Sequence, residues 1–450
     1  MSAPVTSGPD PVADGRRAIE AFEAELARTP KSQRPYEHAT MAYRLGLAYA
    51  ESLAGRPVDN LRRALACYDT AAKIFDPRFD PVEHARVLNA AGAAQRALGD
   101  PRRAAASFSE AARLLAGRDR DVERAAALNN LGLALSDVGE AAPAVAAFDE
   151  ALPLFDTSPE GRRGRAATLV NRGLAYAATG DAAGLSAAVE DYRRALDEID
   201  AAEAPYHWAL AHHSLGVALL GLTELDAGAA GELLPQARRA LAESLSVFRR
   251  TAFPFQYALA KHNLGRAYEA DGDVTSLRRA LAGYEDALGA LDHKEQEAAW
   301  RQIFAGLQRV EQALKGSFPG LSRPAHFAAL LAESGPAERE ALQRERILLL
   351  LALPEHRRHA GLVEAAKAMA ELEREQLRVL IEAELVLLTE LPNEYLEVAL
   401  QARMEAHRRL SGDVREEADR ALDQAVSDAL GGPQRVFVRD YLYSLGFERP

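Results

Sequence analysis

One spacing of small and aromatic residues recurs along the first 290 residues and constrains the fold more than any other feature. Gly132 is followed by Ala144, Phe148 and Ala151, which lie 12, 16 and 19 residues further on. Residues three and four positions apart share one face of a helix. The small residues let a neighbouring helix approach, and the aromatic ring fills the remaining gap. The spacing therefore predicts closely packed pairs of helices in which Phe148, like its counterpart Phe108, is buried.

The same unit recurs around further glycines. The reference glycines are Gly46, Gly92, Gly132, Gly173, Gly216 and Gly265, and their separations are 46, 40, 41, 43 and 49 residues. In four units a second glycine, followed by Asp or Glu, lies seven residues after the first; these glycines are Gly99, Gly139, Gly180 and Gly272. Glycine suits the left-handed residue that ends a helix, and an acidic residue suits the start of the next one. A helix–turn–helix repeat follows.

The fifth unit is irregular. Residues 207–221 predict a good first helix, and residues 223–235 are interpreted as an insertion. The second helix offers Ser244, Phe248 and Thr251 as a degraded version of the small–aromatic–small pattern.

These units resemble the tetratricopeptide repeat (TPR), a pair of helices of about 34 residues that stacks into a superhelix. Two features resemble the extended repeats of kinesin light chains and of TPR regions in bacterial signalling proteins. They are the longer spacing and the sequence Asn129-Asn130-Leu131-Gly132. The resemblance covers roughly residues 35–316. It implies an all-α fold: a right-handed superhelix of about six repeats, then a non-repetitive C-terminal helical region.

Glycine and proline residues that interrupt helices indicate how the chain is divided into domains. Residues 1–12 are predicted to be a disordered tail, and residues 13–34 a capping helix that begins after Asp14. The solenoid spans residues 35–316 and ends at a stretch rich in glycine and proline. A helical bundle is predicted for residues 321–450.

The predicted bundle contains four long helical segments, at residues 337–353, 361–388, 393–410 and 414–430. An apolar stripe runs from Met369 to Leu388 at mostly helical spacing. Two interpretations are open: the stripe forms the core of the bundle, or it forms a coiled-coil seam between two copies of the chain. A homodimer through these helices is therefore one candidate assembly.

Composition and missing motifs exclude several classes of function. The net charge of −12 argues against nonspecific nucleic-acid binding, which requires clustered Lys and Arg. The longest apolar run, residues 347–353, is too short to span a bilayer, and the N-terminus does not resemble a signal peptide. Cys67 is the single cysteine. We therefore expect a cytoplasmic protein that binds neither nucleic acid nor membrane.

Signatures of catalysis are also missing. The sequence contains no phosphate loop, nucleophile elbow or H-E-x-x-H motif. His356 and His359 have a spacing that could serve a metal, but no third ligand is evident and arginines lie between them. We expect no enzyme activity, no metal and no cofactor.

The TPR resemblance implies a binding groove lined by the first helix of each repeat. The residue three positions before each reference glycine would face it, namely Tyr43, Asn89, Asn129, Val170, His213 and His262. The residue after each glycine forms a second row, apolar at Leu47, Leu133, Leu174 and Val217 and basic at Arg266. The predicted partner-binding set is Tyr43, Asn89, Asn129, His213, His262 and Arg266. In the alternative interpretation the Asn and His side chains satisfy neighbouring helices, as Asn130, Asn171 and Asn263 are expected to do.

Two functions are consistent with these features. The first is a non-catalytic scaffold or adaptor that holds a protein or peptide in the groove, with Asn side chains bonded to backbone amides. His213, His262 and Arg266 would meet an acidic or polar group, so that binding strengthens as the pH falls through about 6.5. The alternative is a ligand- or peptide-responsive regulator whose output passes through the C-terminal helices.

Overall fold

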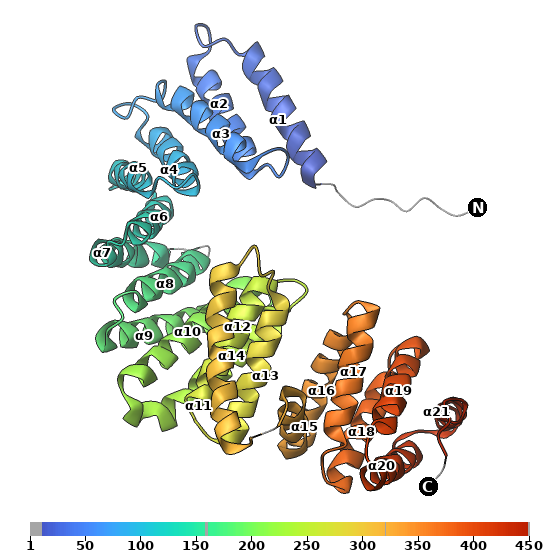
Figure 1. Ribbon diagram of the computed structural model, residues 1–450. Helices are drawn as coiled ribbons and strands as arrows, with labels where there is room; N and C mark the ends of the chain where they lie inside the picture. The colour runs from blue at the N-terminus through green and yellow to red at the C-terminus, as the bar shows by residue number, and fades with distance from the viewer. Residues whose placement is uncertain (1–10, 158–160, 320, 449–450) are drawn as a thin grey trace, which may run out of the picture. The chain divides into compact units, whose positions relative to one another are not determined.

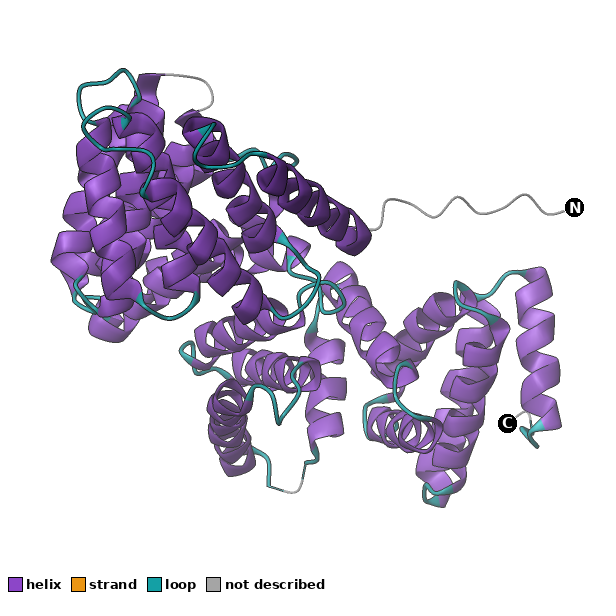
Figure 2. Cartoon of the chain, turned by 90° about the horizontal axis from the view of Figure 1, so that it is seen from above, coloured by secondary structure: helices purple, strands orange, loops and turns teal. Residues whose placement is uncertain are grey.

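The computed structural model describes residues 11–157, 161–319 and 321–448, and every regular element within these ranges is a helix (Figure 2). The predicted all-α fold is confirmed. The chain divides into two compact units, residues 1–252 and 253–450, and each is described here by itself. Most of the predicted N-terminal tail lies outside the described residues.

Five helix pairs follow a leading helix in the first unit. Helix α1, Pro11–Arg28, begins before Gly15 and packs Ile19, Phe22 and Leu26 against the first pair. Each helix of a pair packs against the other and against the next pair. The pairs are α2 (Pro35–Glu51) with α3 (Pro57–Ala72), α4 (Pro81–Ala97) with α5 (Pro101–Leu115), α6 (Asp121–Val138) with α7 (Ala141–Ala151), α8 (Gly161–Ala177) with α9 (Ala182–Glu198), and α10 (Pro205–Leu225) with α11 (Ala230–Val247). Figure 1 shows α4, α6 and α8 in one layer and α5, α7 and α9 in the other.

The turn chemistry within the repeats is as predicted. Gly99, Gly139 and Gly180 have φ values of 84°, 87° and 73°, the left-handed region that favours glycine. The side chain of Asp100 then accepts a hydrogen bond from the backbone N–H of Arg103 at 3.1 Å, which caps α5. These local signals end one helix and begin the next at a fixed distance from the reference glycine.

The reference glycines and the aromatic residues form the contacts that the spacing predicts. A Cβ atom at Gly132 would lie 2.5 Å from the ring of Phe148, so only glycine fits there. Phe108 and Phe148 are 1% and 0% exposed, which confirms their predicted burial. The same contact joins Gly46 to Tyr68, Gly92 to Phe108, and Gly173 to Tyr192. The helix pairs and these contacts give the first unit a TPR-type fold.

The register predicted for the second helix of the fifth repeat is wrong by seven residues. Gly216 packs against Leu241, within the pattern Ala237, Leu241 and Ser244, whereas Phe248 lies two turns further on. Phe248 is fully buried, with its ring 5.6 Å from that of Tyr206. Residues seven positions apart lie on the same helical face, so the sequence alone does not separate the two registers.

The insertion in the fifth repeat lengthens the helices and does not form a long loop. Helix α10 continues to Leu225, and Pro235 lies inside α11. The short 3-10 segment η2, Ala227–Ala229, connects them. A second 3-10 segment, η1 (Leu152–Thr157), follows α7 and carries the buried Phe155.

The second unit begins with the sixth repeat, α12 (Pro254–Glu269) and α13 (Val274–Ala290), followed by α14 (Glu297–Ser317). Gly265 and Gly306 approach the ring of Tyr284, so α14 packs on α13 much as a further repeat would. Ion pairs connect this repeat to later helices: Lys261 Nζ lies 2.8 Å from Glu345 Oε2. The breaker-rich stretch that was predicted to separate two domains thus connects parts of one compact unit.

The C-terminal helices lack the glycine–aromatic pattern, but their first residues are regularly spaced, which was not predicted from the sequence. They are α15 (Arg323–Glu333), α16 (Pro336–Leu351), α17 (Glu355–Met369), α18 (Arg374–Thr389), α19 (Asn393–Arg408), α20 (Gly412–Ala429) and α21 (Gly432–Ser444). From α16 to α20, each helix begins 19 residues after the previous one. Residues 361–388 are two helices and not one, because residues 370–373 interrupt them.

These helices form two layers. Helix α18 packs chiefly against α20, and α17 against α15 and α19, so that α15, α17 and α18 each contact the second helix along the chain more than the next (Figure 1). The apolar stripe from Met369 to Leu388 lies in the core between the helices, and Leu380 and Ile381 are fully buried. This stripe is therefore a core within the chain and not a seam between two copies.

Candidate functional site

Helices α4, α6 and α8 carry the best-defined candidate surface. They pack side by side, which places the predicted groove residues of successive repeats on neighbouring helices. Tyr43, Asn89, Asn129 and His213 are half-buried, whereas Val170 is 5% exposed. The side chains of this row in the first unit are thus partly accessible, except at the fourth repeat.

Hydrogen bonds between asparagines join neighbouring helices. Asn130 Nδ2 donates to Asn89 Oδ1 at 3.1 Å, and Asn171 Nδ2 donates to Asn129 Oδ1 at 2.9 Å. Thr168 Oγ1 donates to the same Asn129 oxygen at 3.1 Å. The expectation that Asn130 and Asn171 bond to neighbouring helices is confirmed. The carbonyl oxygens of Asn89 and Asn129 are also used, but their Nδ2 groups donate to no partner among the described residues.

A hollow of about 320 Å³ lies between α4 and α6. Its lining is Ala93, Arg96, Ala97, Phe108, Asn130 and Asp137. Ala93 stands here where the third and fourth repeats carry the larger Leu133 and Leu174. Arg96 Nε and Asp137 Oδ2, 2.5 Å apart, form a charged pair on its wall. This site was not predicted from the sequence, although an alanine in an otherwise leucine-rich row is a signal that could indicate it.

Leucine side chains continue the row beyond the hollow. Leu47 and Leu133 are half-buried, and Leu174 is 44% exposed. The surface therefore combines a small hollow, exposed apolar side chains and amide donors, which together suit an extended peptide better than a compact polar ligand.

His262 and Arg266 lie in the second unit, on α12. His262 is only 5% exposed, with its ring 5.6 Å from that of Tyr284, and neither ring nitrogen has a hydrogen-bond partner within the described residues. Burial, together with the charges of Arg266 and Arg309, lowers the pKa of His262 to about 4. The predicted increase in binding as the pH falls through 6.5 is therefore wrong for His262, because this imidazole stays neutral there.

Arg266 and its neighbours form a charged cluster at this position. Arg266 Nη1 donates to Asn263 Oδ1 at 3.2 Å. Glu269 accepts hydrogen bonds from the hydroxyl of Tyr284 at 2.6 Å and from Arg309 Nε at 2.8 Å. Arg266 is half-buried, so it is the more accessible member of the predicted pair.

Replacing His262 with glutamine is expected to reduce the loss of stability of the second unit between pH 7 and pH 5 by about 2 kcal/mol. The lowered pKa means that the unfolded chain takes up the proton first. The stability contribution is therefore present above about 6.5 and is lost as the pH falls towards 4. Trp300 fluorescence in a Trp208→Phe background, followed in urea, reports on this unit, because the chain has two tryptophans.

A matched control for this experiment is His356→Gln, which alters an exposed histidine of the same unit. Burial also lowers the pKa values of His326 and His407, so part of the acid sensitivity should remain in both variants. An unchanged dependence on pH in His262→Gln would contradict the assignment.

His356 and His359, whose spacing could serve a metal, both lie on α17. His356 is exposed, and His359 Nε2 lies 2.7 Å from Glu405 Oε2. In the described part of the chain, no cluster of three or more His, Cys, Asp or Glu side chains could hold a metal ion. None of the helices in the described ranges combines the length and the apolarity needed to cross a membrane.

Comparisons with known proteins give structural likeness only. No family model matches the chain, and no curated protein sequence matches it. The chain is similar to BtubC (BKLC) from P. vanneervenii, at 18% identity over 52% of this chain and 90% of that protein, with a TM-score of 0.39. It is also similar to the Rap conjugation gene regulator of plasmid pLS20 in complex with the Phr* peptide, at 14% identity over 95% and 100%, with a TM-score of 0.36.

A third similar structure is the TPR domain of P58(IPK), at 14% identity over 96% of this chain and 97% of that one, with a TM-score of 0.26. Because these scores are below 0.5, the likeness does not by itself establish the fold. The helix pairs and the glycine–aromatic contacts within this chain establish it.

Proposed function

We propose that this chain is a non-catalytic scaffold or adaptor that holds an extended segment of a protein partner along α4, α6 and α8. The observation that carries the proposal is the hollow between α4 and α6, which lies in one row with the exposed Leu174 and with unused amide donors. A solenoid offers such a surface because each repeat presents equivalent positions at a regular distance.

The chemistry of the row defines the kind of segment that fits. A small apolar side chain would occupy the hollow beside Ala93 and Ala97. The Nδ2 groups of Asn89 and Asn129 would donate to backbone carbonyl oxygens of the segment, since amide donors suit an extended backbone. Leu174 would cover a second apolar side chain.

The remaining predicted partner-binding residues have separate roles in this proposal. Tyr43 and His213 extend the row at its two ends in the first unit, where both are half-buried. In the second unit, Arg266 would meet an acidic or polar group. The buried His262 would pack against the ring of Tyr284 and would not titrate during binding.

The test is affinity purification of the tagged full-length chain from its own cells, with quantitative mass spectrometry. Ala93→Trp fills the hollow, and we expect it to reduce recovery of the specific partner at least about tenfold, equivalent to about 1.4 kcal/mol. The matched control is Ala106→Trp, at an exposed position on α5 in the other layer, where recovery should stay within about twofold. Equal recovery with both variants, at unchanged helix content, would contradict the proposal.

A second candidate function, a ligand-responsive regulator, is favoured by a different observation. The C-terminal helices contain a mostly apolar crevice of about 40 Å³, and the buried Gln343 on its wall has an amide oxygen without a hydrogen-bond partner among the described residues.

A further inference from the structure

The hydrophobic core of the sixth repeat is separate from that of the C-terminal helices, although both lie in the second unit. The core of the repeat, which includes α14, contains Tyr284 and Leu307. The core of the C-terminal helices contains Leu331 of α15, Ile347 of α16 and Leu380 of α18. No residue of the described chain belongs to both cores. The contact between α12–α14 and α15–α21, which we call the junction, is therefore not made by one shared core.

Ion pairs cross the junction between the sixth repeat and α16. Arg279 of α13 donates to both carboxylate oxygens of Glu338, from Nε at 2.8 Å and from Nη2 at 3.0 Å. Lys261 of α12 places its Nζ 2.8 Å from Glu345 Oε2. A guanidinium that contacts both oxygens of a carboxylate fixes the direction of approach as well as the distance. These two pairs therefore position α16 on the repeat.

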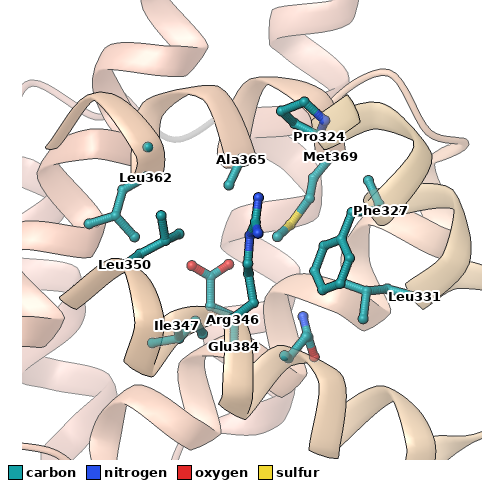
Figure 3. Close-up of a pocket in the computed structure, with 13 residues that line it drawn as sticks. Pro324, Phe327, Leu331, Arg346, Ile347, Leu350, Leu362, Ala365, Met369 and Glu384 are labelled. Carbon is teal, nitrogen blue, oxygen red and sulfur yellow. The ribbon is translucent and has the colours of Figure 1, made fainter. Parts of the chain in front are cut away.

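Further ion pairs extend this row. Arg346 Nη1 of α16 lies 3.3 Å from Glu285 Oε2 of α13, so this pair has the opposite polarity. Figure 3 shows Arg346 beside Phe327 of α15, and the guanidinium lies 5.3 Å from the centre of that ring. Between α13 and α15, which pack directly on each other, Arg278 pairs with Glu333. Charged side chains thus occupy the junction on both α15 and α16.

The spacing of the charges follows the helical repeat. Glu338 and Glu345 are seven residues apart on α16, so they lie on one face at a distance of two turns. Arg279 and Asp286 have the same spacing on α13, and Asp286 shares Lys261 with Glu345. Opposite charges therefore meet at two levels, and they set the register of α16 against the repeat.

The carboxylates of the junction are partly accessible to solvent. The exposed fractions of the side chains are 40% for Glu338, 39% for Glu333 and 32% for Glu345. Dissolved salt screens such charges, because the Debye length falls from about 10 Å at 0.1 M to about 3 Å at 1 M. Burial of apolar side chains is not weakened by this screening. Salt should therefore act on the junction before it acts on either core.

We propose that the junction is a reversible ionic contact, from which α15–α21 separate as one folded module when its charges are screened or reversed. The module keeps its fold because Leu380 and Ile381 are fully buried within its own core. The sixth repeat keeps its fold because Tyr284 stays buried between α12, α13 and α14. The second unit then has two states, with the C-terminal helices docked or free, and ionic conditions set their populations.

Energy transfer between two dyes on the full-length chain tests the proposal. In a Cys67→Ala background, Gln302→Cys on α14 and Glu394→Cys on α19 place the dyes at exposed positions on the two sides of the junction. We expect the separated population, with low transfer, to rise at least about tenfold between about 0.05 M and about 1 M KCl. Helix content by circular dichroism should stay constant. Transfer that does not depend on KCl would overturn the proposal.

Reversal of one charge locates the effect. Arg279→Glu places a carboxylate opposite Glu338, and should raise the separated population at about 0.1 M KCl at least about tenfold. Exchange of the two charges, in Arg279→Glu with Glu338→Arg, should restore the docked population. The matched control is Arg420→Glu, at an exposed position of α20, where the arginine pairs with Glu416 of its own helix at 2.9 Å. This control makes the same change in net charge and should stay docked.

The variants separate the junction from the effect of net charge. Equal separation in Arg420→Glu and Arg279→Glu would show a response to net charge alone and would contradict the role of the junction. An exchanged pair that stays separated at unchanged helix content would do the same. If Arg279→Glu does not fold, the dependence on KCl of the chain with its native charges decides.

Discussion

Replacing Lys261 with methionine is expected to lower the unfolding free energy of the second unit by about 3–5 kcal/mol, the usual cost of breaking a buried charge pair. The ammonium lies 2.8 Å from Glu345 and 3.1 Å from Asp286, and the side chain is 13% exposed. Its removal leaves the carboxylates of Asp286 and Glu345 without the ammonium that they share. Urea titration with Trp300 as the only tryptophan measures the change.

The pKa shifts around Lys261 come from burial and from the neighbouring charges. Burial alone would lower the pKa of Lys261, but the charges of Asp286 and Glu345 outweigh it and raise that pKa. Burial also raises the pKa of Asp286, with a further contribution from Glu345 and against the charge of Lys261. Two carboxylates share one ammonium, so the site has an excess of negative charge and retains protons.

Two further variants separate the buried charge from ordinary surface charge. Lys315→Met removes an exposed ion pair with Glu311, and should cost less than about 1 kcal/mol. Asp286→Asn should cost little at neutral pH, because the raised pKa makes the ionised carboxylate unfavourable there. Its stability contribution is present at low pH and is lost as the pH rises through the raised pKa. Equal losses in Lys261→Met and Lys315→Met would contradict this account.

Truncating Phe148 to alanine is expected to destabilise the third repeat by about 3–5 kcal/mol, because the ring is fully buried between α6 and α7. Gly132→Ala should also destabilise it, by about 1–3 kcal/mol, since the new Cβ would lie 2.5 Å from that ring. Hydrogen exchange of the α6–α8 amides measures both effects locally.

The double variant tests whether glycine and ring act as a pair. In Gly132→Ala with Phe148→Ala, the added methyl group enters the space that the ring vacates, so the combined loss should fall short of the sum by about 1 kcal/mol or more. Gly231→Ala is the control, because a Cβ there meets no neighbour and alanine favours the helix. Additive losses would show that the contact is not the determinant of the repeat.

The glycine–aromatic contacts were predictable because both partners lie in one repeat at fixed offsets. Gly92 and Phe108 show this directly: small and large residues at the predicted spacing meet in the structure. The fifth repeat was harder, since Leu241 and Phe248 lie on the same helical face and aromaticity favoured the wrong one.

Contacts between repeats could not be predicted in the same way. The acceptor of Asn129 is taken by Asn171 and Thr168 of the next repeat, and His262 is buried against α13. Both outcomes depend on how helices stack across variable linkers. The hollow beside Ala93 depends on the same stacking, although the small residues that form it are visible in the sequence.

Because the C-terminal helices pack alternately, the place of a helix in the chain order decides which layer it belongs to. Because α17 packs mainly on α15 and α19, and α18 packs mainly on α20, these helices of odd and even order belong to opposite layers. Loss or gain of one 19-residue segment before α17 would transfer α17 to α20 to the other layer and turn their apolar faces away from their partners. Loss or gain of two segments would leave each helix in its layer. Such a region can change its length only by pairs of helices, even though each 19-residue segment contains a single helix.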